Sequence, residues 1–160
     1  MIVTFCGHSH YFGNAEDEKA LLSLLEKKAK REPIEFFLGE YGGFDQFAYR
    51  CAKKFKVSHP DSRLVFVSPY IGRERKQDDI LPKEARFDLT LYPPIEHIPP
   101  RYAIIHRNRW MIDQADLVIA YVIYRRGGAY ASYRYAKSRG KELYNLAPDM
   151  PDANGIRKPK

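Results

Sequence analysis

The sequence is poor in cysteine: its 160 residues include only Cys6 and Cys51. The two form no CxxC pair, and no group of cysteines and histidines has the spacing of a zinc finger. Each lies in an apolar pattern, one at the end of an expected strand and the other on a helix face. These features predict two buried free thiols in a reducing compartment, and a disulfide is the weaker interpretation.

Long hydrophobic runs are absent as well. No stretch approaches the ~20 apolar residues that a bilayer-spanning helix needs, and the start of the chain, MIVTFCGHSH, lacks the basic and apolar regions of a secretory signal. We therefore expect a cytoplasmic protein without membrane contact. The length favours one domain over 1–147, followed by a flexible basic tail over 148–160 that ends in GIRKPK.

Several motifs of known chemistry are missing. The chain has no GxGxxG, no Walker A loop, no GxSxG and no Cys–His pairing. His8 and His10 are two residues apart, but a metal site needs at least one more ligand, and the remaining histidines show no supporting spacing. The sequence therefore predicts no metal site.

Apolar segments of two periodicities alternate along the chain. Runs typical of strands cover 2–6, 34–39, 63–70, part of 87–94, 116–122 and 142–146. Helical patterns lie between them, after Asn14 as N-cap, over 44–55, over 102–114 and over 129–140, with a loop and a short helix expected over 71–87. This alternation predicts an α/β fold, a doubly wound and mostly parallel sheet with helices on both faces.

Three turns that follow strands carry glycine: CGHS, LGEYGGFD and RRGGA. In doubly wound sheets the ligand binds at the carboxyl ends of the strands, so these turns are candidates for one binding site. The candidate residues are Gly7, His8, Ser9, Gly39, Gly42, Gly43, Phe44, Asp45, Gly127, Gly128, Ala129 and Tyr130. Backbone N–H groups of the paired glycines would face phosphate, Asp45 would hold a ribose hydroxyl or cap its helix, and rings would flank the base. The alternative is a set of ordinary turns.

The helix over 102–114 adds two further candidates. Ile104, Asn108, Met111, Ile112 and Ala115 fall on one stripe, which places the Asn108 amide toward the core or a cleft. Arg107 would lie at the edge of that stripe. A buried amide needs partners, so this pair is expected either to contact the ligand or to form a structural network.

Positive charge dominates the chain, which carries a net charge of +7 and a pI of about 9.4. Residues 125–141 contain six basic side chains and no acid. This run is either a solvated helix face or a surface for phosphate, on a small ligand or on nucleic acid. The many aromatic residues leave rings for a partner, so we also expect a homo-oligomer.

The ordered motifs FCGHSHYFG, FLGEYGGFDQFA, YPPIE, RNRWMIDQADLVIAYV, GGAYASYRYAK and LYNL resemble the SLOG superfamily, the group named for the Smf/DprA and LOG proteins. The resemblance covers about residues 2–146, and the most similar branch is that of the small YpsA-like proteins of unknown function. It implies a Rossmann-like fold that binds a nucleotide or a nucleotide-derived ligand, such as an NAD- or ADP-ribose-like molecule, over the three glycine turns.

The resemblance leaves three functions open. The first is sensing or binding of a nucleotide-type small molecule. The second is an N-glycosidase of the LOG type, which cleaves the base from a nucleoside monophosphate. LOG proteins carry PGGxGTxxE, whereas this chain reads RRGGAYASYRYA without the glutamate, so Glu40 or Asp45 would have to replace it. The third is nucleic-acid binding, as in DprA-type members.

Overall fold

The computed structural model describes residues 1–70 and 86–148. Most of the loop expected over 71–87 lies outside these ranges, as does the basic tail from residue 149 onward. Six strands are present in the described chain: β1 (Ile2–Gly7), β2 (Glu35–Leu38), β3 (Arg63–Val67), β4 (Leu89–Leu91), β5 (Leu117–Tyr121) and β6 (Glu142–Asn145). The helices are α1 (Ala15–Ala29), α2 (Gly43–Ser58), α4 (Ala103–Gln114) and α5 (Gly127–Ser138), and a short 3₁₀ helix, η1 (Pro100–Tyr102), precedes α4.

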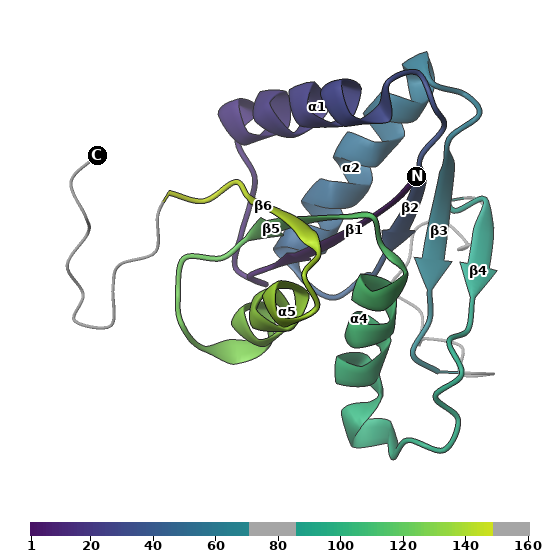
Figure 1. Cartoon of the computed structure of the whole chain (residues 1–160), viewed down its shortest axis with the longest axis vertical. Helices are drawn as coiled ribbons and strands as arrows, with labels where there is room; N and C mark the ends of the chain where they lie inside the picture. Colours follow the sequence, from purple (N-terminus) through teal and green to yellow (C-terminus); the bar gives the residue numbers. More distant parts are fainter. Residues whose placement is uncertain (71–85, 149–160) are drawn as a thin grey trace.

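The strands form one parallel sheet in the order β4-β3-β2-β1-β5-β6 (Figure 1). Val3 of β1 lies opposite Phe36 of β2 on one side and Leu117 of β5 on the other. The chain builds the sheet outward from β1 to β4 and then crosses over to β5. Strand order therefore reverses between β1 and β5, which is where doubly wound sheets bind ligands.

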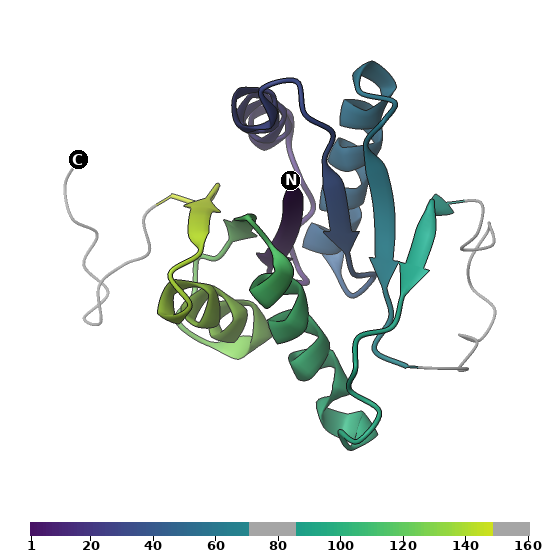
Figure 2. The same cartoon turned by 45° about the vertical axis from the view of Figure 1, so that its right-hand side comes forward.

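Helices cover both faces of the sheet, as the alternation of strands and helices predicts (Figure 1, Figure 2). Val3 and Phe5 of β1 pack toward α1 and α2, whereas Cys6 packs toward α4 and α5. Successive strand residues point to opposite faces, so a strand buried on both sides reads as a continuous apolar run. The prediction of a doubly wound α/β fold is confirmed.

Local signals at the helix ends also agree with the structure. The Asn14 side chain caps α1 by accepting a hydrogen bond of 2.8 Å from the Asp17 N–H. Gly140, at a φ of 65°, follows the end of α5 in the left-handed conformation that glycine favours.

The two cysteines are free and buried, as predicted. Burial raises the pKa of both the Cys6 and the Cys51 thiol to about 12, so neither is a thiolate near neutral pH.

Within residues 1–70 and 86–148, no helix combines the length and the apolar character that crossing a membrane requires. The same residues contain no group of three or more histidine, cysteine or acidic side chains placed to hold a metal ion.

Candidate functional site

A cavity of about 780 Å³ opens at the carboxyl ends of the strands, at the point where strand order reverses. One wall comes from the end of β1 and the turn after it. The second comes from the segment between β5 and α5 together with the first turn of α5. Helix α4 and the turn before α2 complete it. The lining residues are Phe5, Cys6, Gly7, His8, Ser9, His10, Tyr41, Asp45, Ile104, Arg107, Asn108, Met111, Tyr124, Arg126, Gly127, Gly128, Ala129 and Ser132.

The structure brings nine of the predicted site residues to this cavity: Gly7, His8, Ser9, Asp45, Arg107, Asn108, Gly127, Gly128 and Ala129. It places the others elsewhere. Gly39 and Glu40 line a smaller pocket of about 200 Å³, Tyr130 packs against the core between α5 and the sheet, and Phe44 is fully buried.

Phe44 does not flank a ligand, contrary to the prediction. Its side chain is 0% exposed and packs beneath Gly7 at the end of β1. A Cβ on Gly7 would lie 2.3 Å from the Phe44 ring, so Gly7 is a glycine because this ring fills the space beside it. The apolar pattern of α2 places Phe44 in the core, and its proximity to a glycine turn is the misleading signal.

The glycine pair before α2 packs against the turn after β1, and the Gly43 N–H is not free for phosphate, contrary to the prediction. The Gly43 N–H donates a hydrogen bond of 2.8 Å to the Ser9 carbonyl. A Cβ on Gly43 would lie 1.8 Å from the Tyr11 carbonyl oxygen, and one on Gly42 would lie 2.7 Å from the Ser9 Cα. These glycines therefore let the turn after β1 pack against the start of α2.

A charged pair lies beside Gly39, at the floor of the cavity. A Cβ on Gly39 would be 2.7 Å from Arg107 Nη1 and 2.9 Å from Asp45 Oδ2. Arg107 Nη1 donates a hydrogen bond of 2.9 Å to the Val67 carbonyl at the end of β3, and its guanidinium lies 5.1 Å from the centre of the Tyr41 ring. Gly39 thus leaves room for an arginine that joins α4 to the sheet.

Arg107, rather than Asn108, is the buried polar residue of α4. Arg107 is 1% exposed and shares the inner face of the helix with Ala103, Met111 and Ile112. Asn108 is half-buried where α4 borders the cavity. The inner face is rotated from the predicted stripe because a buried arginine with polar partners occupies a position that hydropathy assigns to the surface.

Asp45 lies near the guanidinium at the cavity wall. Its Oδ2 accepts a hydrogen bond of 2.8 Å from the Tyr41 N–H. Burial raises the pKa of the Asp45 carboxyl, an effect that the Tyr41 hydrogen bond and the Arg107 charge oppose.

Glu40, the other acid considered for catalysis, does not line the cavity. Its carboxylate forms an ion pair with Arg86 in the neighbouring smaller pocket. Asp45 is therefore the carboxylate that lines the cavity within the described residues.

His8 connects the two loops on either side of the strand-order reversal. Its Nε2 accepts hydrogen bonds from the backbone N–H of Ile123 at 3.0 Å and of Tyr124 at 3.3 Å. The ring centroids of His8 and Tyr124 are 5.0 Å apart. A protonated Nε2 cannot accept these bonds, so the neutral imidazole holds the segment that leads into α5.

We expect His8 to make stability pH-dependent. Burial and the nearby His10 lower the pKa of His8 below its ordinary value of 6.5. The unfolded chain therefore takes up the proton first, and stability that is complete above pH 6.5 falls as the pH drops below it. Between pH 7 and pH 5 the free energy of unfolding should fall more steeply in the wild type than in His8→Gln, measured by urea denaturation. His97→Gln, at an exposed position, should keep the wild-type slope. Equal slopes for wild type and His8→Gln would contradict this assignment.

The first turn of α5 forms an exposed wall of the cavity. No side chain caps this helix at Arg126, and the N–H groups of a first helical turn have no partner within the helix. A Cβ on Gly127 or Gly128 would meet no protein atom within 4 Å. Gly127 has a φ of 80°, which favours glycine, but packing within the described residues gives no reason for a glycine at position 128.

Nine of the residues that line the cavity were not among the predicted site residues, and three of them bear on its chemistry: Tyr41, Tyr124 and Ser132. The Tyr41 ring lies under the Arg107 guanidinium, the Tyr124 ring contacts His8 at an interplanar angle of 51°, and Ser132 lies on α5 beyond the glycines. Ser132 could have been found, because it is four residues after Gly128 and therefore lies on the same face of the helix.

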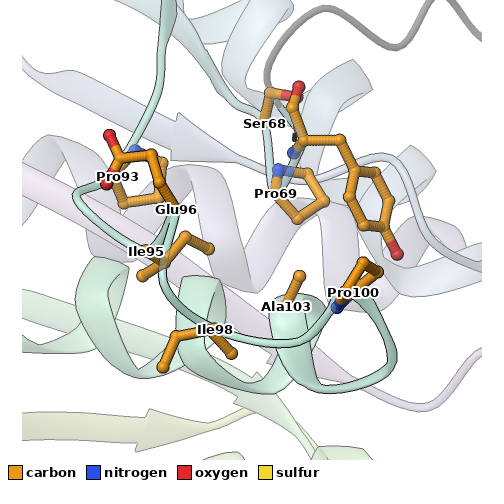
Figure 3. Close-up of a pocket in the computed structure, with 9 residues that line it drawn as sticks. Ser68, Pro69, Pro93, Ile95, Glu96, Ile98, Pro100 and Ala103 are labelled. Atoms are coloured by element: carbon orange, nitrogen blue, oxygen red, sulfur yellow. Dashed lines mark hydrogen bonds between the residues drawn. The ribbon is translucent and has the colours of Figure 1, made fainter.

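A separate pocket of about 220 Å³ lies at the ends of β3 and β4, beyond Arg107. Figure 3 shows that most of the residues around it are prolines and aliphatic residues, with Pro69 on one side and Pro93, Ile95, Ile98 and Pro100 around it. Its serine, Ser68, already bonds the backbone of Tyr70. None of the predicted site residues lies there.

The chain is similar in sequence to a curated protein from a bacterium. The chain is 24% identical over 152 residues to the uncharacterized SPbeta prophage-derived protein YoqJ of Bacillus subtilis (strain 168), covering 83% of this chain and 88% of that protein. No protein-family model matches the chain.

Two solved structures share the architecture. DNA processing protein A from Helicobacter pylori, studied for its single-stranded DNA binding mode, superposes with a TM-score of 0.60 at 20% identity, over 95% of this chain and 67% of that one. The X-ray structure of TM1055 gives a TM-score of 0.50 at 12% identity, over 89% and 71%. The fold is therefore Rossmann-like. Membership of the SLOG superfamily, and of its YpsA-like branch, stays a prediction.

Proposed function

We propose that this protein binds a nucleotide or nucleotide-derived ligand in the cavity between β1 and β5, with a phosphate group on the first turn of α5. The observation that carries the proposal is the open space beside Gly127 and Gly128 in a cavity of about 780 Å³. That volume lies in the range of ligand sites, which is roughly 300–1,000 Å³.

The first turn of α5 has the chemistry of a phosphate site. Its unpaired N–H groups and the helix dipole favour an anion, and the exposed Arg126 adds a positive charge at the same wall. Arg107 is too deeply buried to serve as the phosphate ligand. The phosphate therefore belongs to the side of the cavity next to α5.

The opposite side of the cavity suits the rest of a nucleotide. Asp45 places a carboxylate there, which accepts hydrogen bonds from hydroxyl groups such as those of ribose. Tyr41 adds an aromatic ring on this side and Tyr124 adds one from the segment before α5, and such rings stack on bases. NAD-like and ADP-ribose-like molecules combine all three parts.

The proposal is tested by filling the space beside Gly128. A thermal-shift screen of the wild type against nucleotides, NAD, ADP-ribose and cyclic dinucleotides identifies the ligand, with a stabilisation of about 2.7 kcal/mol expected at ~100-fold excess over Kd. Gly128→Val should abolish the shift because its side chain occupies the phosphate position. The matched control is Ala131→Val, at an exposed position of the same helix, which should bind normally. Normal binding by Gly128→Val would contradict the proposal.

An N-glycosidase is a different function for the same cavity, with Asp45 as its acid. Burial raises the pKa of the Asp45 carboxyl above its ordinary value, which is the direction that a general acid requires. Chromatography of nucleoside monophosphates incubated with the protein separates this activity from binding. Release of free base by the wild type and not by Asp45→Asn would establish it.

The basic side chains of α5 favour a third candidate function, the binding of single-stranded nucleic acid. Arg134 lies over the Tyr130 ring at 5.9 Å and Lys137 over the Tyr133 ring at 5.5 Å, and α5 contains no acidic residue. Exposed cations interleaved with aromatic rings suit the backbone and bases of a single strand. Affinity for oligothymidylate should then fall steeply with salt and on changing Arg134 or Lys137 to alanine. A flat response to salt would exclude this function.

A further inference from the structure

Ser132 combines burial with a hydroxyl group that has no partner in the described chain. Its side chain is 8% exposed and lines the cavity. Within residues 1–70 and 86–148, no hydrogen bond to this hydroxyl is formed. Ser138, on the same helix, instead donates a hydrogen bond of 2.7 Å to the Tyr135 carbonyl.

The Ser132 hydroxyl faces the cavity. Most buried polar side chains form hydrogen bonds, and the Ser132 oxygen, which is accessible from the cavity, can form its own with whatever occupies that space. The other buried residue of α5 is Ala136, and alanine is the better helix former. An alanine at position 132 would fill the same space against the core. The hydroxyl therefore adds a hydrogen-bond donor that faces the cavity and could contact a ligand there.

Helix geometry places Ser132 next to the proposed phosphate position. It follows Gly128 by four residues and Ala129 by three, so the three residues share one face of α5. All three line the cavity. A phosphate on the N–H groups of the first turn would therefore have the Ser132 hydroxyl on its inner side.

We propose that Ser132 is a ligand-binding residue whose hydroxyl donates a hydrogen bond to a phosphate oxygen of the bound nucleotide. This inference rests on the proposed function of the cavity and adds a specificity determinant to it. The hydroxyl reaches one turn deeper than the backbone donors, so it selects ligands with a phosphate seated against the helix over ligands with an uncharged group there.

The test is calorimetric titration of wild type, Ser132→Ala and Ser138→Ala with AMP and with inorganic pyrophosphate. Hydrogen bonds to charged groups contribute about 1.5–3 kcal/mol, so Ser132→Ala should weaken both ligands by at least about tenfold. Ser138→Ala, which changes an exposed hydroxyl, should bind like the wild type. Thermal denaturation without ligand should show Ser132→Ala at least as stable as the wild type, which separates a binding role from a structural one.

Each remaining outcome has a definite meaning. Unchanged AMP binding by Ser132→Ala, together with its loss in Gly128→Val, would overturn the role of Ser132 and leave the nucleotide cavity in place. Weakened binding of AMP with unchanged binding of pyrophosphate would overturn the contact with phosphate. A wild type that binds neither AMP nor pyrophosphate would overturn the phosphate subsite itself, and the wider screen of NAD, ADP-ribose and cyclic dinucleotides then decides the proposed function separately.

Discussion

Gly43→Ala should lower the free energy of unfolding by roughly 3 kcal/mol, because the added methyl group overlaps backbone atoms that cannot move independently. The new Cβ would lie 1.8 Å from the Tyr11 carbonyl oxygen and 2.9 Å from that of Ser9. Relief of this clash separates the turn after β1 from the start of α2 and breaks the hydrogen bond from the Gly43 N–H to Ser9.

Gly128→Ala is the matched control, since it makes the same chemical change at the other glycine pair. Its Cβ meets no protein atom within 4 Å, and alanine favours the helix over glycine by about 0.5–1 kcal/mol. Urea denaturation should therefore show opposite signs for the two variants. A similar loss of stability in both would contradict the distinction between a packing glycine and a ligand-facing glycine.

Arg107→Met should cost about 3–5 kcal/mol of stability, because it leaves the buried carboxyl of Asp45 without its positive neighbour. It also removes the hydrogen bond from Arg107 Nη1 to the Val67 carbonyl. Arg109→Met on the exposed side of the same helix is the control and should stay near the wild type. Equal losses in the two variants would show that the charge of Arg107 near Asp45 and its hydrogen bond to the Val67 carbonyl do not contribute to stability.

The loss in Arg107→Met should also depend on pH. Burial already raises the pKa of Asp45, and removal of the Arg107 charge, which opposes that rise, should raise it further. A carboxyl whose folded pKa is raised destabilises the fold above that pKa and recovers as it binds a proton. The deficit measured at pH 7 should therefore shrink as the pH is lowered toward 3.8, the ordinary pKa of this carboxyl, and Asp45→Asn should recover part of it in the double variant.

The strands and their succession along the chain were largely predictable, because this sheet is buried on both faces. The sequence of β5, LVIAY, is apolar at every position, which periodicity alone recognises as a strand covered on both sides. Parallel strands joined by helices then require the turns after β1, β2 and β5 to meet at one edge. The location of the cavity followed from this rule without any knowledge of side-chain packing.

The roles of individual glycines were not predictable, because a packing glycine and a ligand-facing glycine read alike in a sequence. Gly43 and Gly128 each stand second in a GG pair before a helix, yet one is enclosed by the Ser9–Tyr11 backbone and the other faces open space. Only the tertiary arrangement of the turn after β1 distinguishes them.

Buried polar residues were misassigned for a related reason. Hydropathy places arginine on the surface, so the stripe of α4 was drawn through Asn108 instead of Arg107. The burial of Arg107 depends on the Val67 carbonyl and on Asp45, which belong to elements far away in the sequence. Glu40 was likewise assigned to the ligand site because its partner, Arg86, is 46 residues away.

The central claim is that a phosphate-bearing nucleotide occupies the first turn of α5, and amide chemical shifts report on that turn directly. We would titrate ¹⁵N-labelled protein with AMP and with ADP-ribose and follow the backbone amides of the described chain. The largest shifts should fall on Gly128 and Ala129, with smaller ones at His8 and Tyr41. Shifts confined to the outer face of α5 around Arg134 and Lys137, or no shifts for either ligand, would contradict a nucleotide site in this cavity.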